Sequence, residues 1–152
     1  MAVPDRYEEA FAAYVRFYET LTPARVGELR ALAVPDMHFR DPFNDVRDVE
    51  RVVAIFAAMY ERMAAPVFHV LDTARTGNIG YIRWTFSFRR KKEPETAAPW
   101  LIEGVTRVEL ATDGRVLSHI DYWDAAGELY ERVPILGGVL RFLRRRIAAV
   151  HG

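Results

Sequence analysis

The sequence predicts a single α+β domain in which helices cover a strongly bent, mostly antiparallel sheet, with an apolar pocket between the two layers. Apolar residues recur at helical spacing as far as Met63 and then alternate with polar residues from Val67 to Trp123. Tight-turn signals divide the alternating stretch into consecutive strands, which is the pattern of a meander. A length of 152 residues fits one domain with a core of its own.

Two helical segments are expected before Pro35. Asp5 and Glu8 have the spacing of an N-terminal capping box, and apolar residues at helical spacing extend the first helix to about Leu21. The dipeptide Thr22-Pro23 then begins a short second helix, because proline is tolerated in the first helical turn. This second helix is predicted to end before Pro35.

A short extended segment and a third helix follow. Met37 to Arg40 is extended and leads into Asp41-Pro42, where the proline keeps Asp41 out of the helical region. Asp48 is suited to cap the third helix. The broad apolar face of this helix consists of Val49, Val52, Val53, Phe56, Met59, Tyr60 and Met63.

Strands joined by hairpins are expected in the next part of the chain. Thr76-Gly77-Asn78 and Asp113-Gly114 are tight-turn signals, and a polar loop from Arg90 to Pro99 separates the two hairpins. The predicted strands are Val67 to Arg75, Ile79 to Arg89, Trp100 to Leu110 and Arg115 to Trp123.

The chain is predicted to become helical again from Ala125, to be interrupted at Pro134 and then to resume. We therefore expect a core fold over residues 1–126 and a C-terminal helical extension over residues 127–152. The extension is amphipathic and basic, which fits either a solvated face that complements the helix dipole or a contact with an anionic membrane. Its apolar residues are Leu136, Leu140, Leu143, Ile147 and Val150, and its arginines are Arg141, Arg144, Arg145 and Arg146.

Composition excludes several classes of function. Lys plus Arg and Asp plus Glu both number 21, and this neutral balance argues against nucleic acid as the main partner. The chain has no cysteine, so disulfides and thiolate chemistry are excluded. Its histidines are scattered and it has no glycine-rich phosphate loop, so we expect neither a metal nor a cofactor. The polar, acidic N-terminus and the lack of an apolar run of about 20 residues favour a cytoplasmic protein.

Three segments of the chain resemble a known fold. They are Phe39-Arg40-Asp41-Pro42, Asp113-Gly114-Arg115-Val116 and the stretch from His119 to Asp124 on the last strand. Together with the order of the elements as far as Trp123, they resemble the nuclear transport factor 2-like fold. That superfamily includes SnoaL-like polyketide cyclases, ketosteroid isomerases, limonene epoxide hydrolases and scytalone dehydratases. The resemblance implies a cone-shaped, cystatin-like fold around an apolar cavity, and a homodimer formed through the outer sheet face.

The resemblance to ketosteroid isomerases is incomplete. Those enzymes pair a general base in the Asp-Pro segment with an oxyanion hole made of a tyrosine on the first helix and a protonated acid on the third long strand. Here the tyrosine position falls on Phe17, with Tyr14 and Tyr18 nearby, and the acid position falls near Thr106. These residues therefore do not support steroid isomerisation.

Alternation along the last strands predicts which side chains face the cavity. His119, Asp121 and Trp123 share one face of the last strand, and His119 and Asp121 are about 6–7 Å apart along it. The charged side chains of the two preceding strands fall on the opposite face, which we expect to meet solvent or a second subunit. The pocket wall is predicted to contain Ile82, Trp84, Phe86, Phe88, Trp100, Ile102, Gly104, Thr106 and Val108.

Asp121, His119 and Asp41 are the catalytic candidates. A carboxylate in an apolar wall must find polar partners, and at a cavity it is also placed for acid–base chemistry. The alternative for Asp121 is a structural hydrogen bond to a helix end or to Tyr18. Asp41 is either a general base at the pocket mouth, as the resemblance implies, or a cap for backbone N–H groups in the Asp-Pro turn.

A small apolar molecule is the expected ligand. The chain is then either a cofactor-independent isomerase, cyclase, dehydratase or epoxide hydrolase, or a non-catalytic domain that binds a hydrophobic ligand or lipid. A scaffold that assembles through the outer sheet face is a third alternative. The candidate ligand-binding residues are Tyr14, Tyr18, Phe56, Trp84, Phe86, Trp100, Thr106 and Trp123.

Overall fold

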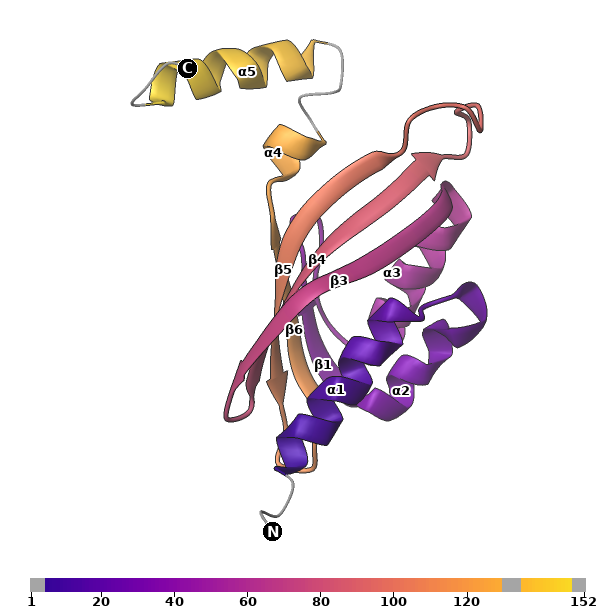
Figure 1. Cartoon of the computed structure of the whole chain (residues 1–152), viewed down its shortest axis with the longest axis vertical. Helices are drawn as coiled ribbons and strands as arrows, with labels where there is room; N and C mark the ends of the chain where they lie inside the picture. The colour runs from indigo at the N-terminus through magenta and orange to yellow at the C-terminus, as the bar shows by residue number, and fades with distance from the viewer. Residues whose placement is uncertain (1–4, 130–134, 149–152) are drawn as a thin grey trace. The chain divides into compact units, whose positions relative to one another are not determined.

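The computed structural model describes residues 5–129 and 135–148. The chain divides into two compact units, one ending at Tyr122 and the other beginning at Trp123. The first unit contains helices beside a long, bent sheet, which confirms the predicted α+β class (Figure 1).

The helical segments before the sheet begin where the sequence predicts. Helix α1 (Arg6–Glu19) is capped by Asp5, whose carboxylate accepts a hydrogen bond from the backbone N–H of Tyr7 at 3.0 Å. Pro23 then starts a 3₁₀ segment, η1 (Pro23–Glu28), which continues into the single turn of α2 (Leu29–Leu32). The second helical segment therefore ends before Pro35, as expected.

Helix α3 (Val49–Arg62) also follows its prediction. The carboxylate of Asp48 accepts a hydrogen bond from the backbone N–H of Glu50 at 2.9 Å and so caps the first turn. Val49, Val52 and Phe56, all on the predicted apolar face, are the buried side chains of this helix.

The predicted meander is present, with one strand longer than expected. Its strands are β3 (Met63–Thr76), β4 (Ile79–Arg90), β5 (Trp100–Leu110) and β6 (Val116–Trp123). The pattern placed the start of β3 after Pro66, whereas the strand begins directly after α3. This first stretch is irregular, because Ala65 has a φ of 50° and the register against β4 shifts between Ala64 and Val67.

Two short strands extend the sheet beyond β6. β1 (Ala33–Arg40) runs parallel to β6 and antiparallel to β2 (Asp45–Arg47). Only the end of β1 was predicted, and β2 was not. Pro35, which cannot donate to a ladder, lies where the ladder is interrupted, because the register against β6 shifts between Ala33 and His38.

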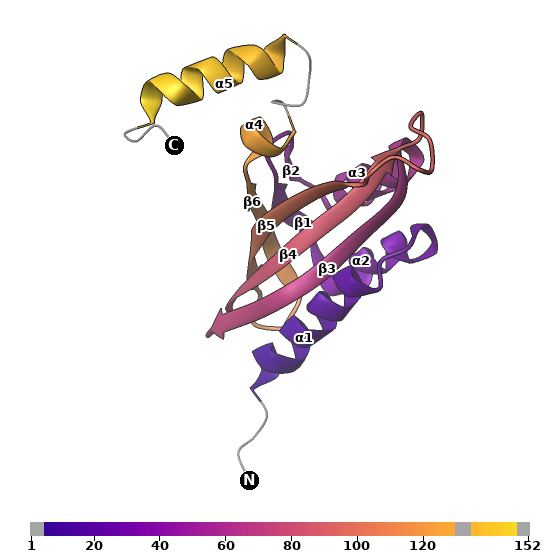
Figure 2. The same ribbon diagram turned by 45° about the horizontal axis from the view of Figure 1, so that its top comes forward.

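The strands of the described residues form one six-stranded sheet in the order β2-β1-β6-β5-β4-β3. The sheet is therefore unclosed, with β2 and β3 as its edges. Figures 1 and 2 show α1, α2 and α3 along the same side of this curved sheet. Side chains from both layers meet there: the ring of Tyr18 on α1 lies 5.7 Å from that of Phe68 on β3, and Phe39 on β1 lies 5.6 Å from Phe56 on α3.

The predicted strand parity holds on β4 and β5. Side chains of the predicted wall are buried except for the half-buried Trp100, whereas Tyr81, Arg83 and Glu103 on the opposite face are exposed. The buried members of the wall are Ile82, Trp84, Phe86, Phe88, Ile102, Gly104, Thr106 and Val108.

The second unit contains two helices in its described residues. α4 (Ala125–Glu128) is capped by Asp124, whose carboxylate accepts from the backbone N–H of Gly127 at 2.8 Å. α5 (Leu136–Ile147) is the predicted extra C-terminal helix. Pro134 and Val150 lie outside the described residues, and the domain boundary after residue 126 stays a prediction. No helix in the described parts of the chain is both long and apolar enough to cross a bilayer.

Gly80 marks a close approach between β4 and α1, and its replacement tests their packing. A Cβ at Gly80 would overlap the Phe11 ring, whose Cδ2 would lie only 2.6 Å away. We expect Gly80→Ala to lower the free energy of unfolding by about 1–3 kcal/mol, because overpacking forces one layer to shift. Chemical denaturation measures this, with Gly138→Ala as the matched control.

Gly138 lies in helix α5 and a Cβ there would meet nothing within 4 Å. Alanine is favoured over glycine inside helices by about 1 kcal/mol, so Gly138→Ala should not destabilise the protein. Equal stability of Gly80→Ala and the unmodified protein would contradict the placement of Phe11 against β4.

Candidate functional site

His119 and Asp121 on β6 lie on the helix-covered side of the sheet. His119 is only 1% exposed, and the side chain of Asp121 is 16% exposed. Although the two residues are separated along the strand, their side chains lean together, so that His119 Nε2 lies 2.8 Å from Asp121 Oδ1. The structure therefore brings together the two residues that strand parity selected.

A second donor fixes the same carboxylate oxygen. The hydroxyl of Thr106 on β5 donates to Asp121 Oδ1 at 2.5 Å, and the Thr106 oxygen itself accepts a hydrogen bond from Trp84 Nε1 on β4 at 2.8 Å. The indole N–H can only donate, so it leaves the Thr106 proton for the carboxylate. Three adjacent strands thus supply a directed chain of hydrogen bonds that ends at Asp121.

The other carboxylate oxygen of Asp121, Oδ2, differs from Oδ1 in its contacts. It makes no hydrogen bond within the described parts of the chain. No buried side-chain oxygen or nitrogen of these residues lacks a partner, so Oδ2 is accessible. The side chain borders a small cavity of about 20 Å³, which has room for about one water molecule.

The cavity lies between the sheet and the helices and is mostly apolar. Phe68, Val70 and Ile82 line it but were not among the ligand-binding candidates. Phe68 and Val70 could have been found from the alternation of the predicted strand that starts at Val67, which puts both on one face. The lining residues are Tyr18, Phe56, Phe68, Val70, Ile82, Trp84, Thr106, His119 and Asp121.

Two tyrosines of α1 reach the other nitrogen of His119. The hydroxyl of Tyr14 lies 2.8 Å from His119 Nδ1, and that of Tyr18 lies 3.2 Å from it. Burial raises the pKa of both phenols well above the usual value near 10, so both stay protonated and can donate. Tyr18 had been considered as a partner of Asp121; in the structure its hydroxyl contacts His119 instead.

Aromatic packing fixes the plane of the imidazole. The Phe39 ring stacks on His119 with centroids 5.1 Å apart, and the Tyr18 ring lies at the same centroid distance, tilted by 33°. Each nitrogen of the imidazole makes a hydrogen bond, and the rings of Phe39 and Tyr18 pack against it. His119 therefore has one well-defined orientation. The side chain is therefore a rigid support for Asp121.

Asp41 lies in a different environment. Its Oδ1 accepts hydrogen bonds from the backbone N–H groups of Phe43 and Asn44, both at 2.7 Å, and the Asn44 amide donates to both carboxylate oxygens. Asp41 is not among the residues that line the cavity. These contacts match the turn-capping role that the sequence offered as the alternative to a general base.

The remaining ligand-binding candidates do not all line the cavity. Phe56 and Trp84 line the cavity, whereas Phe86 stacks on Phe68 with centroids 4.4 Å apart. Trp100 is half-buried, and its indole N–H donates to Glu93 Oε1 at 3.2 Å. Trp123 is half-buried at the start of the second unit.

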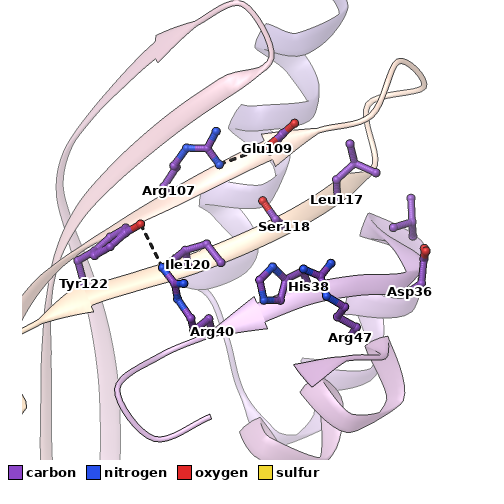
Figure 3. Close-up of a pocket in the computed structure, with 11 residues that line it drawn as sticks. Asp36, His38, Arg40, Arg47, Arg107, Glu109, Leu117, Ser118, Ile120 and Tyr122 are labelled. Atoms are coloured by element: carbon purple, nitrogen blue, oxygen red, sulfur yellow. Dashed lines mark hydrogen bonds and ion pairs between the residues drawn. The ribbon is translucent and has the colours of Figure 1, made fainter. Parts of the chain in front are cut away.

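The opposite face of the sheet carries a larger groove, of about 500 Å³ (Figure 3). Three of its charged side chains are in ion pairs: His38 Nε2 is 2.7 Å from Asp45 Oδ1, and Arg107 is 3.3 Å from Glu109. Exposed ion pairs of this kind contribute little and need no ligand. The smaller cavity, where polar groups converge in an apolar surrounding, is therefore the candidate functional site. Homodimerisation through the outer face stays a prediction.

A metal site finds no support in the side chains described. Nowhere in residues 5–129 and 135–148 do three His, Asp or Glu side chains gather closely enough to hold an ion.

The buried tyrosines predict how stability depends on pH. Their pKa values in the folded state are raised above the unfolded value of about 10. The stabilisation that the protonated phenols give the folded state is therefore complete below pH 10 and is lost as the pH rises further. The free energy of unfolding should fall by about 1.4 kcal/mol per pH unit for each such tyrosine. Urea unfolding between pH 9 and 11 should show a shallower fall for Tyr18→Phe.

The control is Tyr81→Phe, which removes a hydroxyl from an exposed side chain on the other sheet face. Its stability should fall with pH as steeply as that of the unmodified protein. A Tyr18→Phe curve parallel to both would mean that the Tyr18 phenol is not buried in the folded state.

Comparison with known proteins places the fold. A family model for the SnoaL-like domain matches residues 14–119, well over half of the chain. None of the curated protein sequences compared with the chain matches it.

Solved structures agree with the family model. A protein from Jannaschia sp. provisionally named a SnoaL-like polyketide cyclase is 16% identical, with a TM-score of 0.68 over 84% of this chain and 92% of that chain. A Mycobacterium tuberculosis LEH-like epoxide hydrolase is 18% identical, with a TM-score of 0.66 over 93% of this chain and 96% of that chain. A protein of ketosteroid isomerase-like fold from Catenulispora acidiphila, in complex with trimethylamine, is 15% identical, with a TM-score of 0.65 over 84% and 92%.

These identities are low enough that each likeness establishes the fold alone, and the fold hosts several chemistries. The match to the SnoaL-like family model and the structural likeness to a SnoaL-like protein agree with each other. The chain belongs to the SnoaL-like family, and its fold is that of nuclear transport factor 2-like proteins.

Proposed function

We propose that this chain is a cofactor-independent enzyme that performs acid–base chemistry on a small apolar molecule, in the manner of an isomerase, cyclase, dehydratase or epoxide hydrolase. The observation that carries the proposal is the asymmetry of Asp121. One of its oxygens is fixed by His119 and Thr106, and the other is accessible beside an apolar cavity. An accessible carboxylate oxygen beside an apolar cavity is placed to accept a proton from a bound molecule.

Asp121 is the general base in this proposal. An ionised carboxylate can only accept, so the hydrogen bond at 2.8 Å requires His119 Nε2 to carry a proton. Oδ2 then removes a proton from a C–H group of the substrate or from a water molecule, and the neutral acid returns that proton in a later step. A positioned acid–base group is worth about 10²–10⁴-fold in rate.

His119 and its supports hold the base in place. The imidazole N–H and the Thr106 hydroxyl stabilise the charge on Oδ1 before substrate binds, and Tyr14 and Tyr18 satisfy the far nitrogen. Because these donors are already in place, the carboxylate stays oriented and no reorganisation energy is needed during the reaction. His119 thereby orients the carboxylate, while its buried tyrosine partners keep their own protons.

Substrate binding requires the cavity to enlarge. Pockets for small organic ligands usually span about 300–1,000 Å³, whereas this cavity measures about 20 Å³. The wall best able to move is β3, because it is an edge strand and its register against β4 shifts between Ala64 and Val67 and again between Val70 and Asp72. Phe68 and Val70 lie between these two irregularities, so we expect them to yield to the ligand.

A non-catalytic binding domain is the second candidate. It is favoured by the apolar lining and by the small size of the closed cavity. In that case Asp121 and His119 would orient a bound ligand without moving protons. The two candidates differ in one respect that can be measured: only an enzyme loses turnover when the carboxylate is neutralised while binding is kept.

The names of the structural relatives support the enzymatic candidate. One relative is provisionally named a polyketide cyclase and another an epoxide hydrolase. A suitable panel therefore contains small epoxides, β,γ-unsaturated ketones and linear poly-β-ketones, with products followed by mass spectrometry.

Asp121→Asn should reduce turnover of any substrate found in this panel by about 10²–10⁴-fold, because the amide keeps the shape but cannot accept a proton. Asp72→Asn is the matched control, since Asp72 is an exposed carboxylate paired with Arg83. Asp41→Asn serves as a second comparison.

Full turnover by Asp121→Asn would reject Asp121 as the base. A loss of turnover in Asp41→Asn alone would assign the role of general base to Asp41 in the Asp-Pro turn. No turnover of any panel member, together with tight binding of one that Asp121→Asn weakens, would favour the binding domain.

A further inference from the structure

Helix α5 (Leu136–Ile147) has two sharply different faces. Leu136, Leu140, Leu143 and Ile147 follow one another at intervals of three and four residues, which places them on one side of the helix. Leu136, Leu143 and Ile147 are 44%, 47% and 82% exposed. An exposed aliphatic stripe of this kind is costly in water and usually marks a contact surface.

The charged residues of α5 are all arginines, and the side opposite the stripe also carries Phe142. Helical spacing puts Arg141 and Arg145 opposite the aliphatic stripe and Arg144 and Arg146 at its two borders. The guanidinium of Arg146 lies over the Phe142 ring at 5.2 Å, and that of Arg144 lies 3.4 Å from Asp124 Oδ2. The helix contains no acidic residue.

This charge is concentrated at the end of a neutral chain. Residues 135–152 contain four arginines and no Asp or Glu, which is a charge of +4. Residues 1–134 therefore hold 17 basic and 21 acidic side chains, a charge of −4, which balances to the net charge of zero. Such asymmetry points to an anionic partner for the end of the chain alone.

We infer that α5 docks on the surface of an anionic lipid bilayer, with its aliphatic stripe below the headgroups and its arginines among the lipid phosphates. Both faces are needed for this partner, whereas a nucleic acid would use the arginines and leave the stripe in water. Twelve residues make a helix of about 18 Å, so α5 lies in the plane of the interface and does not cross it. The inference does not depend on the chemistry of Asp121.

Vesicle flotation with the full chain tests this directly. The protein should bind phosphatidylcholine vesicles that contain about one third phosphatidylglycerol, and should not bind pure phosphatidylcholine. Because each basic residue near the surface contributes about fivefold to binding, Arg145→Gln with Arg146→Gln should weaken binding about 25-fold. Raising the salt concentration should weaken it further.

The matched control removes the same charge elsewhere. Lys91→Gln with Lys92→Gln neutralises two exposed basic residues of the β4–β5 loop and should leave vesicle binding unchanged. The apolar half is tested by Leu143→Glu with Ile147→Glu, which should abolish binding. Far-ultraviolet circular dichroism of each variant confirms that the fold is retained.

Several outcomes would overturn the inference. They are no binding to anionic vesicles at low salt, equal binding to neutral vesicles, and equal weakening by the Lys91 and Lys92 substitutions. Binding to an RNA oligonucleotide in place of vesicles would assign the arginines to nucleic acid. Self-association lost in Leu143→Glu with Ile147→Glu, without vesicle binding, would assign the stripe to a second copy of the chain.

Discussion

The hydrogen bond between His119 Nε2 and Asp121 Oδ1 determines what the interior of this fold can do. A carboxylate in an apolar wall is tolerated only if donors compensate for its lost hydration, and His119 and Thr106 provide that compensation at a single oxygen. The second oxygen makes no hydrogen bond within the described residues, and the side chain borders the small cavity. Tyr14 and Tyr18 complete the arrangement from α1, so the helix layer and the sheet both contribute to holding one carboxylate.

Much of the fold could be predicted because its signals are local. Alternation along β4 and β5 fixes which side chains are buried, and Asp5 and Asp48 cap α1 and α3 within their own turns. The missed parts depend on distant pairing. Strand β2 (Asp45–Arg47) is too short for a periodic signal and exists because β1 lies beside it. The alternating pattern begins only after Pro66, whereas pairing with β4 starts β3 at Met63.

The candidate site was only half predictable for the same reason. Strand parity alone places His119 and Asp121 on the helix-covered face, since side chains of alternate residues must share a side. It gives no distance between Tyr14 on α1 and His119 on β6, which depends on how the two layers pack. The closed state of the cavity, which Phe68 helps to fill, is likewise a property of packing and has no local sequence signal.

The state of the His119 imidazole tests the central claim most directly, and it needs no substrate. Nitrogen-15 NMR of the ring at neutral pH reports which nitrogen carries a proton. An ionised Asp121 requires the proton on Nε2, with Tyr14 beside Nδ1, and Asp121→Ala should then shift the Nε2 resonance. A bare Nε2 with the proton on Nδ1 would mean that Asp121 is the donor, and a protonated carboxyl cannot serve as the base.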